Sequence, residues 1–558
     1  MSRFVANYGR IVYMNSKHAI EKLLPLYLDF DRTNSDSILE YAKLLGKNKV
    51  SFQDMIDLQK AYAEKNELPD GLTLFKVNGG RGALGIALEE CYFGKKRDNE
   101  QEPDFPLAGV ELKSSPLDKK NNRYVPGERI SITNLDINTE MPENFKESHV
   151  YKKLKSMLVV YYYRDKKQSR RWDFKIKDVF LYHPSENDMI NFIEDYKYIK
   201  KKRDEGLFDK ISEADTSFLG VCTKGKNKDS NYREQSVGGK LAQKRAFCLK
   251  EGFAEILYSR YIKPDPDLEK IFDEEERDPL TEALYKKVQE YRGQSDRELC
   301  DRFNVEYFEE EDNDSEERDE DGNLTDNEKK VKIKSMHSML SFRMLGLKSN
   351  KSVELTGASI VVKSIRINDY GKMDESLSFP AFDFKELEQE KKWELSKIYH
   401  ELGEKKYLFF VYKKMGRGYH FMGCQLWNMP YKDLAKAKKT WKETIEILRN
   451  RTVGLPESRN EVEKTARGYA PIKNNFPKEA SSKVMHVRPH ASKRYYRFKD
   501  GTEIGDNPSY GSELWDGVFM TKQSFWLNKD YVSKQISKDL KGKCWRKKRT
   551  KRNTKSIL

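Results

Sequence analysis

The 558-residue chain has few cysteines and histidines, and neither residue type occurs at a spacing that binds metal. Its six cysteines are scattered without a Cys-x-x-Cys pair, and its eight histidines form no His-Glu-x-x-His motif. We therefore expect neither a disulfide framework nor a zinc site. We also expect the protein to act in a reducing cytoplasm. No apolar run approaches the roughly 18 to 20 residues of a spanning helix, and the N-terminus has no apolar stretch of secretory length. No membrane partner is expected.

Acidic residues are also in the minority, with 90 Asp and Glu against 105 Lys and Arg, for a net charge of +15. A basic excess of this size favours a polyanionic partner, with nucleic acid first and an anionic membrane surface second. The length is too great for one hydrophobic core and predicts two to four domains. Hydrophobic residues make up 37% of the chain, which is enough for packed cores.

The segment 103–113 places two carboxylates and an ammonium close together in the sequence. It reads Pro-Asp-Phe-Pro-Leu-Ala-Gly-Val-Glu-Leu-Lys, with Asp104 ahead of a Glu-x-Lys. The apolar residues around Glu111 predict a strand, on which Glu111 and Lys113 emerge from the same face. Two carboxylates beside an ammonium can hold a hard divalent cation and position a water. The alternative is an edge strand that carries charges to prevent aggregation.

Pro-Asp, a spacer and then Glu-x-Lys is the signature of the PD-(D/E)xK nucleases. The longer run from Asp104 to Pro116 resembles MutH, the GATC-nicking endonuclease of mismatch repair, and more closely the MutH-related type II restriction enzymes that cut GATC. The resemblance implies a mixed α/β, MutH-like fold with a central mixed sheet flanked by helices. It also implies that Asp104 and Glu111 bind Mg²⁺ and that Lys113 orients or activates the attacking water.

A glycine-rich segment, 77–82, precedes an expected helix, but no Gly-Lys-Ser/Thr follows, so a nucleotide P-loop is not expected. In the MutH group a Gly-x-x-x-Glu on this helix supplies an active-site glutamate. Gly85 selects Glu89, whereas the next landmark, Gly94, selects Glu90, as though one residue were inserted. Adjacent helical residues differ by about 100°, so only one can face the site. The unbroken register before Glu89 favours Glu89.

Two further segments of the first half resemble the MutH group. Ser-His-Val-Tyr-Lys-Lys-Leu-Lys at 148–155 matches a segment whose lysine assists in the active site, here Lys153, although a solvated helix face is the alternative. Cys-Thr-Lys-Gly at 222–225 matches the loop that reads bases, with Lys224 in the base-reading position. Cys222 and Cys248 depart from MutH, which leaves the individual base contacts open.

Basic residues surround this reading loop. Lysines alternate with small polar residues after Cys222, and others bracket an expected amphipathic helix from about 240, so a phosphate-contacting surface is predicted. The DNA contacts expected from this half are Lys224, Lys226, Lys244, Arg245 and Lys250.

The second half looks like another MutH-like unit. Residues 357–365 fall where 108–116 fall in the first half. In this register Lys363 matches the first-half lysine, whereas Val361 and Glu354 replace the glutamate and the aspartate. Val361 cannot bind a metal, so this half is expected to bind DNA without cutting it.

The end of the second half resembles MutH's own reading loop and the helix after it. The matching segments are His-Val-Arg-Pro-His at 486–490 and the run 520–532. The DNA contacts expected here are Arg488, His490 and Lys522.

The expected domains are a catalytic domain at 1–262, a helical connector with an acidic insertion at 263–330, a DNA-binding domain at 331–540 and a basic tail at 541–558. The run 309–328 is almost devoid of apolar residues and is expected to be disordered. Apolar periodicity predicts the following elements: helices at 19–28, 37–45, 52–65, from 187, and over much of 268–303, and strands at 157–163, 178–183 and 407–412.

The resemblance implies a type II restriction endonuclease of bacterial cytoplasm that cuts both strands of GATC 5′ of the G with Mg²⁺. It further implies that double-stranded DNA binds at two GATC sites at once, the second as an effector, that a cognate DNA methyltransferase is the functional partner, and that the protein is a monomer or a DNA-induced dimer. A MutH-type nickase is one alternative, which the duplicated half disfavours. A non-catalytic DNA-binding regulator is another, which the intact first-half motif disfavours.

Overall fold

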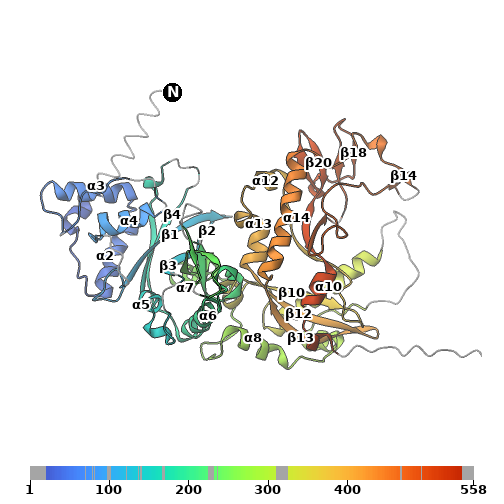
Figure 1. Ribbon diagram of the computed structural model, residues 1–558, viewed down its shortest axis with the longest axis horizontal. Helices are drawn as coiled ribbons and strands as arrows, with labels where there is room; N and C mark the ends of the chain where they lie inside the picture. Colours follow the sequence, from blue (N-terminus) through green and yellow to red (C-terminus); the bar gives the residue numbers. More distant parts are fainter. Residues whose placement is uncertain are drawn as a thin grey trace, which may run out of the picture. The chain divides into compact units, whose positions relative to one another are not determined.

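The computed structural model divides the chain into two compact units (Figure 1). Unit 1 comprises Met1–Leu280 and Lys351–Ser359, and unit 2 comprises Thr281–Asn350 and Ile360–Leu558. The structure describes residues 20–542, apart from 70, 78–79, 81, 97–101, 121, 136, 138–140, 166, 168–169, 224–230, 236, 310–324, 466–467, 492 and the side chains of 325–331.

Unit 1 contains a mixed four-stranded sheet with the order β2-β1-β4-β5. β1 (Glu111–Lys120) runs parallel to β4 (Met157–Tyr163), while β2 (Arg123–Pro126) and β5 (Ile176–Tyr182) pair antiparallel at the two edges. β4 reads MLVVYYY and its first five residues are buried, as is typical of a central strand covered on both faces. The strand predicted at 157–163 is therefore confirmed to the residue.

Helices α2 (Ser35–Lys47), α3 (Phe52–Ala63) and α4 (Ala83–Ala87) belong to the same core as this sheet. α2 begins where the Asn34 side chain accepts two backbone N–H bonds, and α3 begins with a capping box of Ser51 and Asp54. The helices predicted at 37–45 and 52–65 are confirmed. The helix predicted at 19–28 is confirmed in part, because residues 20–23 are α-helical and continue into a short 3-10 turn at Leu24–Leu26.

A second, antiparallel sheet in unit 1 has the order β3-β9-β6, and β7 pairs with β8 as a hairpin. The expectation of a helix from about 240 is wrong over its first part, because the fully buried residues 245–249 form β9 and the helix α7 begins only at Glu251. The remaining elements of this unit are β3 (Ile130–Leu135), α5 (His149–Leu154), α6 (Glu186–Asp204), β6 (Leu219–Thr223), β7 (Tyr232–Glu234), β8 (Leu241–Gln243), β9 (Arg245–Leu249), α7 (Glu251–Tyr261) and α11 (Val353–Gly357).

Unit 2 repeats both sheets. β10 (Ile360–Ile367) runs parallel to β12 (Lys406–Met415), which pairs antiparallel with β13 (Gly418–Trp427), as β1, β4 and β5 do in unit 1. β11 (Leu377–Phe382), β21 (Gln523–Leu527) and β16 (Met485–Pro489) form an antiparallel sheet that matches β3, β9 and β6. The predicted mixed α/β class and its duplication are confirmed.

Additional small sheets extend unit 2, with the strand orders β18-β17-β20-β19 and β14-β15. The predicted acidic run lies largely outside the described residues, as does the basic tail after 542. Other elements of the second half are α8 (Leu280–Gln289), α9 (Asp296–Phe303), α10 (Thr325–Met344), α12 (Phe384–Gln389), α13 (Lys397–Tyr399), α14 (Tyr431–Arg449), β14 (Lys464–Thr465), β15 (Gly468–Tyr469), β17 (Tyr496–Arg497), β18 (Glu503–Ile504), β19 (Gly511–Trp515), β20 (Val518–Thr521), α15 (Lys529–Gln535) and α16 (Lys538–Lys541).

Within the described residues, none of the helices combines the length and the apolar character needed to cross a bilayer.

Candidate active site

Asp104 and Glu111 lie side by side at the start of β1. The chain between them folds back on itself, because Phe105 and Val110 exchange backbone hydrogen bonds of 2.9 and 3.2 Å. Glu111 Oε2 accepts the backbone N–H of Asp104 at 3.2 Å, and Asp104 Oδ2 accepts that of Leu112 at 2.9 Å. This turn brings both carboxylates to the same end of the strand.

Three ammonium groups contact this carboxylate pair. Lys113 Nζ lies 2.5 Å and Lys153 Nζ 3.3 Å from Glu111 Oε1, so two predicted lysines converge on the same oxygen. Lys95 Nζ lies 3.1 Å from Asp104 Oδ1. Sequence analysis missed Lys95. Its only signal was its place directly after the Gly94 landmark, and lysines are too common in this chain for that to single it out.

Glu89 faces the same cluster from the end of helix α4. The helix continues into a single π-helical turn at Leu88–Tyr92, in which the N–H of Phe93 bonds to the carbonyl of Leu88. A π-turn accommodates one extra residue within an α-helix. The π-turn therefore accommodates the inserted residue noted in the sequence. The helical register that precedes it, which selects Glu89, is unchanged.

Burial and neighbouring carboxylates set the charge state of Glu89. Desolvation first, and then the Asp104 carboxylate, raise its pKa from 4.5 to about 7, against the opposing effects of Lys113 and Lys95. The charges that act on Glu89 are those of Asp104, Lys113, Lys95 and Glu111, whereas Glu90 acts on Cys91, together with Lys60. The structure thus brings Glu89, rather than Glu90, to the carboxylate pair.

Burial also raises the pKa of Glu111, whose side chain is only 2% exposed, while Lys113 opposes this effect. Three carboxylates, on Glu89, Asp104 and Glu111, therefore share a confined volume with three lysine ammoniums. Such a site can bring a phosphodiester against positive charge and still offer carboxylate oxygens to a cation.

The oxygen donors fit a small hard cation. Magnesium is commonly held by one or two carboxylates, with waters and substrate phosphate completing its shell. Asp104 and Glu111 provide such a pair. No group of three or more His, Cys, Asp or Glu side chains arranged to hold a metal occurs in the described part of the chain, so the protein itself offers a sparse ligand set.

Two of the DNA contacts predicted in the first half are buried instead. Arg245 Nη1 donates to the carbonyl of Ile211 at 2.8 Å, and Lys250 Nζ donates to the carbonyl of Thr216 at 3.0 Å. Both side chains therefore hold the fold together, and we no longer regard them as DNA contacts. Lys244 is partly exposed, whereas Lys224 and Lys226 lie outside the described residues.

The DNA contacts predicted in the second half lie together at one end of the β16–β21 pair. The N–H of His490 donates to the carbonyl of Lys522 at 2.8 Å, and His490 Nδ1 lies 3.0 Å from Ser524 Oγ. The Arg488 guanidinium stacks over the ring of Trp526, 4.4 Å from its centroid. A guanidinium, an imidazole and an ammonium at one strand end form a surface that can contact phosphate or base edges.

Strand pairing places the unit 2 counterpart of the Glu-x-Lys at the start of β10. In unit 1, Glu111 pairs with the first residue of β4 and Lys113 with the third. In unit 2, Ile360 pairs with the first residue of β12, while Val361 pairs with Tyr407 and Lys363 with Phe409. The pairing thus allows Ile360 or Val361 at the position of the glutamate, and both are apolar. The sequence match of Lys363 to Lys113 selects Val361.

The residue aligned with Asp104 in the second half is not available as a metal ligand. Glu354 Oε1 accepts the backbone N–H groups of Ile271 and Phe272 at 3.0 and 3.1 Å, within unit 1. The counterpart site in unit 2 therefore lacks both carboxylates of the pair, and its residues do not fit a magnesium ion.

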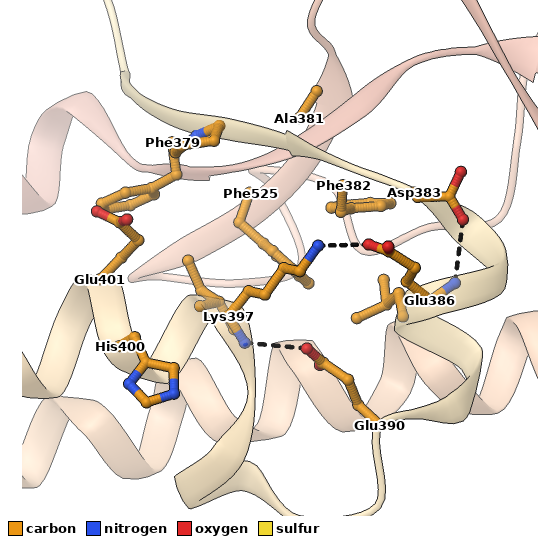
Figure 2. A pocket seen from close by; sticks show the side chains of 13 residues that line it. Phe379, Ala381, Phe382, Asp383, Glu386, Glu390, Lys397, His400, Glu401 and Phe525 are labelled. Carbon is orange, nitrogen blue, oxygen red and sulfur yellow. Dashed lines mark hydrogen bonds and ion pairs between the residues drawn. The ribbon is translucent and has the colours of Figure 1, made fainter. Parts of the chain in front are cut away.

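Unit 2 also contains a cavity of about 260 Å³ (Figure 2). Phe379, Phe382 and Phe525 line it, and the Lys397 backbone N–H donates to Glu390 at 2.9 Å on its rim. The cavity has largely apolar walls. Its lining includes the Lys397–Glu386 ion pair but no pair of carboxylates at the start of a strand beside a lysine, so it is not the candidate active site.

Comparison with known proteins places the first half among MutH-like sequences. The family described as "DNA mismatch repair enzyme MutH" matches residues 93–195, which include Asp104, Glu111, Lys113 and Lys153. The MutH proteins of Escherichia coli O6:K15:H31 and Citrobacter koseri are 24% and 25% identical, each over 33% of this chain and 78% of its own length.

A longer match extends over both halves. The type II restriction enzyme Sau3AI of Staphylococcus aureus is 30% identical over 496 residues, which are 84% of this chain and 96% of Sau3AI. The similarity therefore includes the duplicated second unit, which a match over one third of the chain cannot span.

Proposed function

This chain belongs to the family of the type II restriction enzyme Sau3AI, and on that premise we propose that it cleaves both strands of DNA at GATC, 5′ of the G, in a Mg²⁺-dependent reaction. The observation that carries the proposal is the cluster of Asp104, Glu111 and Lys113 at the start of β1, in a chain similar to Sau3AI over nearly its whole length. The GATC specificity rests on the resemblance of the two reading segments.

We propose a role for each side chain of the cluster. Asp104 and Glu111 hold the cation, which when bound acts as a Lewis acid and lowers the pKa of water. Lys113, beside Glu111, orients the attacking water and balances developing charge, while Lys153 contacts the scissile phosphate. Glu89 supports the cation or the water. Attack in line leaves a 5′-phosphate and a 3′-hydroxyl.

In our proposal unit 2 binds a second GATC duplex as an effector. It retains Arg488, His490 and Lys522 at one strand end but has Val361 where a metal carboxylate would be. Occupation of unit 2 favours the cleavage-competent form of unit 1. Because such activation is a coupling free energy, DNA in either unit must tighten DNA binding in the other.

Restriction of this kind requires a second activity that protects the host's own GATC sites, so we propose a cognate DNA methyltransferase as the functional partner and the bacterial cytoplasm as the place of action. The protein acts as a monomer or as a DNA-induced dimer. A MutH-type nickase is the second candidate; the similarity of residues 93–195 to MutH favours it, and the repeated sheets of unit 2 disfavour it.

The test is to incubate purified protein with a supercoiled plasmid that carries GATC sites, with Mg²⁺ or with EDTA, and to map the ends. Linear fragments with cuts 5′ of the G in both strands are expected only with Mg²⁺. Open circles alone would favour the nickase. Intact plasmid that is nevertheless bound would leave a non-catalytic regulator.

A further inference from the structure

A second structural equivalence between the two units identifies another residue in the unit 2 counterpart of the active site. In unit 1, Ser148 caps helix α5 by accepting the N–H of Tyr151 at 3.2 Å, and Lys153 follows five residues after Ser148. In unit 2, Ser396 caps α13 by accepting the N–H of Tyr399 at 3.1 Å. Both serines also donate to the carbonyl three residues before them. The residue five after Ser396 is Glu401, so Glu401 stands in place of Lys153.

The counterpart site in unit 2 is rich in lysine side chains, whereas a metal site is rich in carboxylates. Lys363 is half-buried on β10. Desolvation lowers its pKa most, the Glu401 carboxylate opposes this effect, and Lys334 and Lys405 lower the pKa further. Lys334 and Lys363 in turn lower the pKa of His490, which is mainly lowered by burial. Positive groups on α10, β10 and β16, namely Lys334, Lys363 and Arg488, therefore lie near the His490 imidazole, whose neutral form burial favours.

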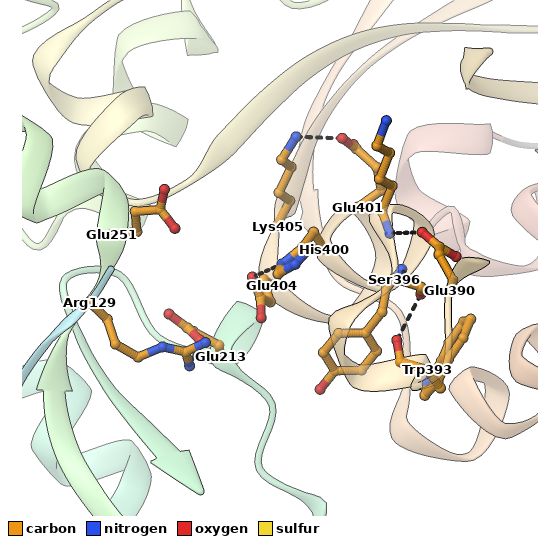
Figure 3. Close-up of polar contacts among 12 residues, drawn as sticks. Arg129, Glu213, Glu251, Glu390, Trp393, Ser396, His400, Glu401, Glu404 and Lys405 are labelled. Carbon is orange, nitrogen blue, oxygen red and sulfur yellow. Dashed lines mark hydrogen bonds and ion pairs between the residues drawn. The ribbon is translucent and has the colours of Figure 1, made fainter. Parts of the chain in front are cut away.

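Two carboxylates lie beside this cluster, and both are already engaged. Glu375 lies 4.0 Å from Lys334 Nζ and 3.3 Å from Arg366 Nη2. Glu401 is the carboxylate whose charge acts on Lys363. It lies 2.6 Å from Lys405 Nζ and accepts the Tyr407 hydroxyl at 3.0 Å, and Figure 3 shows Lys405 reaching toward it. Within the described residues, the Lys363 ammonium has neither a hydrogen bond nor an ion pair. A half-buried ammonium in this condition is poised for an external anion, because burying a charge without a partner is costly.

We propose that this cluster is a metal-independent phosphate site, in which Lys363 directly contacts a backbone phosphate of the effector duplex. The inference rests on the proposed effector role of unit 2 and deepens it. In unit 1 the carboxylates repel a phosphate unless a cation lies between them, whereas unit 2 lacks this carboxylate pair and keeps the matching lysine, Lys363. The effector duplex therefore binds without a divalent ion, and the cleaved duplex does not.

The experiment measures binding of a fluorescently labelled GATC duplex to the full-length protein by anisotropy, in EDTA and in Ca²⁺, over a range of salt. In EDTA we expect one duplex to bind tightly to each chain. In Ca²⁺ we expect a second duplex to bind as well. Lys363→Met keeps the volume of the side chain and removes its charge. It should weaken the EDTA-resistant binding about tenfold or more and make the log–log salt dependence shallower by about 0.9.

Two further variants separate a lost contact from a damaged fold. Glu401→Gln removes the negative charge beside Lys363 and keeps an oxygen for Tyr407, so it should tighten the EDTA-resistant binding, which a folding defect cannot do. Lys442→Met removes the same charge from the exposed face of α14, where Lys442 pairs with Glu446 at 3.5 Å, and should change nothing.

The outcomes are distinct. Unchanged affinity and salt dependence for Lys363→Met, or EDTA-resistant binding that Glu401→Gln weakens, overturns the phosphate site and leaves the effector role of unit 2 standing. Loss of all binding in EDTA overturns its metal independence. A single duplex per chain even in Ca²⁺ overturns the effector role itself, and the phosphate site with it.

Discussion

Glu111 connects most of the groups in the candidate active site. It accepts bonds from Lys113, Lys153 and the backbone of Asp104, and its side chain is almost fully buried. Removing it leaves two ammoniums without their acceptor and the proposed cation without one of two carboxylates. The consequences for chemistry should therefore exceed those for DNA binding.

We expect Glu111→Ala to lower the cleavage rate by about three orders of magnitude, as for loss of a principal electrostatic group, while GATC binding persists. The control is Glu102→Ala, which removes an exposed carboxylate paired at 2.6 Å with Lys152 in the same loop region. Plasmid cleavage and duplex anisotropy measure the two effects. Cleavage by Glu111→Ala at the rate of the control would refute the site.

The raised pKa of Glu89 makes stability depend on pH in the metal-free protein. Below its ordinary pKa of 4.5 the carboxyl is neutral whether folded or unfolded, so burial carries no ionisation cost. As pH rises through about 7 the folded state must ionise it at a cost that the unfolded chain does not pay, so stability is lost.

Glu89→Gln should therefore be more stable than the wild type at about pH 8, by up to roughly 3 kcal/mol, and show little advantage near pH 4.5. Urea unfolding in EDTA at the two pH values measures the difference. An advantage of equal size at both would show that packing, rather than ionisation, is responsible.

Arg245 and Lys244 are adjacent basic residues with different environments, which the sequence could not distinguish. Both appear in a charged segment, but Arg245 is buried against the carbonyls of Ile211 and Asp209. A buried cation can be recognised only when the carbonyls it will meet are known, and these lie more than thirty residues away in the chain.

Arg245→Ala should lower the free energy of unfolding by about 3 kcal/mol, because it leaves buried carbonyls unpaired. Lys244→Ala should leave stability nearly unchanged and make the salt dependence of DNA binding shallower by about 0.9. Chemical unfolding and anisotropy titrations distinguish them. Unchanged stability of Arg245→Ala, together with a shallower salt dependence of its DNA binding, would show instead that Arg245 contacts DNA.

At the scale of elements, hydrophobic patterning predicted those helices and strands that depend on the local sequence. β4 was predicted at its observed bounds, because a run of seven apolar and aromatic residues has no helical periodicity to compete with a buried strand. β9 was missed, because its basic flanks and following helix dominate the pattern. The pairing of β9 with β3 and β6 is a tertiary effect that no local window contains.

The π-turn at Leu88–Tyr92 resolves the one ambiguity of register that the sequence left open. Deleting Glu90 should convert the turn to α-helix, keep Glu89 on the site and retain most cleavage. Deleting Leu88 instead should rotate Glu89 by about 100° and abolish cleavage. Comparing the two deletions for cleavage and thermal unfolding tests this, and equal loss in both would place the extra residue elsewhere.

At the scale of the whole molecule, the repeated sheets predict that two DNA sites are used together. A plasmid with one GATC should be cut slowly, and an added GATC oligonucleotide should accelerate it. Arg488→Ala, on β16 of unit 2, should reduce that acceleration, whereas Lys439→Ala, on the exposed face of α14, should not. Equal rates on one-site and two-site plasmids at matched site concentration, with no response to oligonucleotide, would leave unit 2 only a clamping role.

The duplication could be recognised in the sequence because Lys363 and the reading segments survived in the second half. The engagement of Glu354 with the backbone of Ile271 and Phe272 could not, since it depends on a packing partner more than eighty residues away. Its residue type suggested that Glu354 replaces Asp104. Its contacts show instead that this carboxylate accepts backbone hydrogen bonds within unit 1.

The assignment of residues 351–359 to unit 1 has a practical consequence for dissecting the protein. The chain leaves unit 1 after Leu280, returns at Lys351 and departs again after Ser359, so no single cut separates the two units. This returning segment supplies the Ala358 carbonyl to Lys250 at 3.2 Å, and the Thr356 carbonyl packs directly against Gly252. A recombinant fragment ending near residue 280 would leave a buried ammonium short of an acceptor. Truncated or domain-exchanged proteins must therefore keep this nine-residue segment with the first half, by circular permutation or by co-expression.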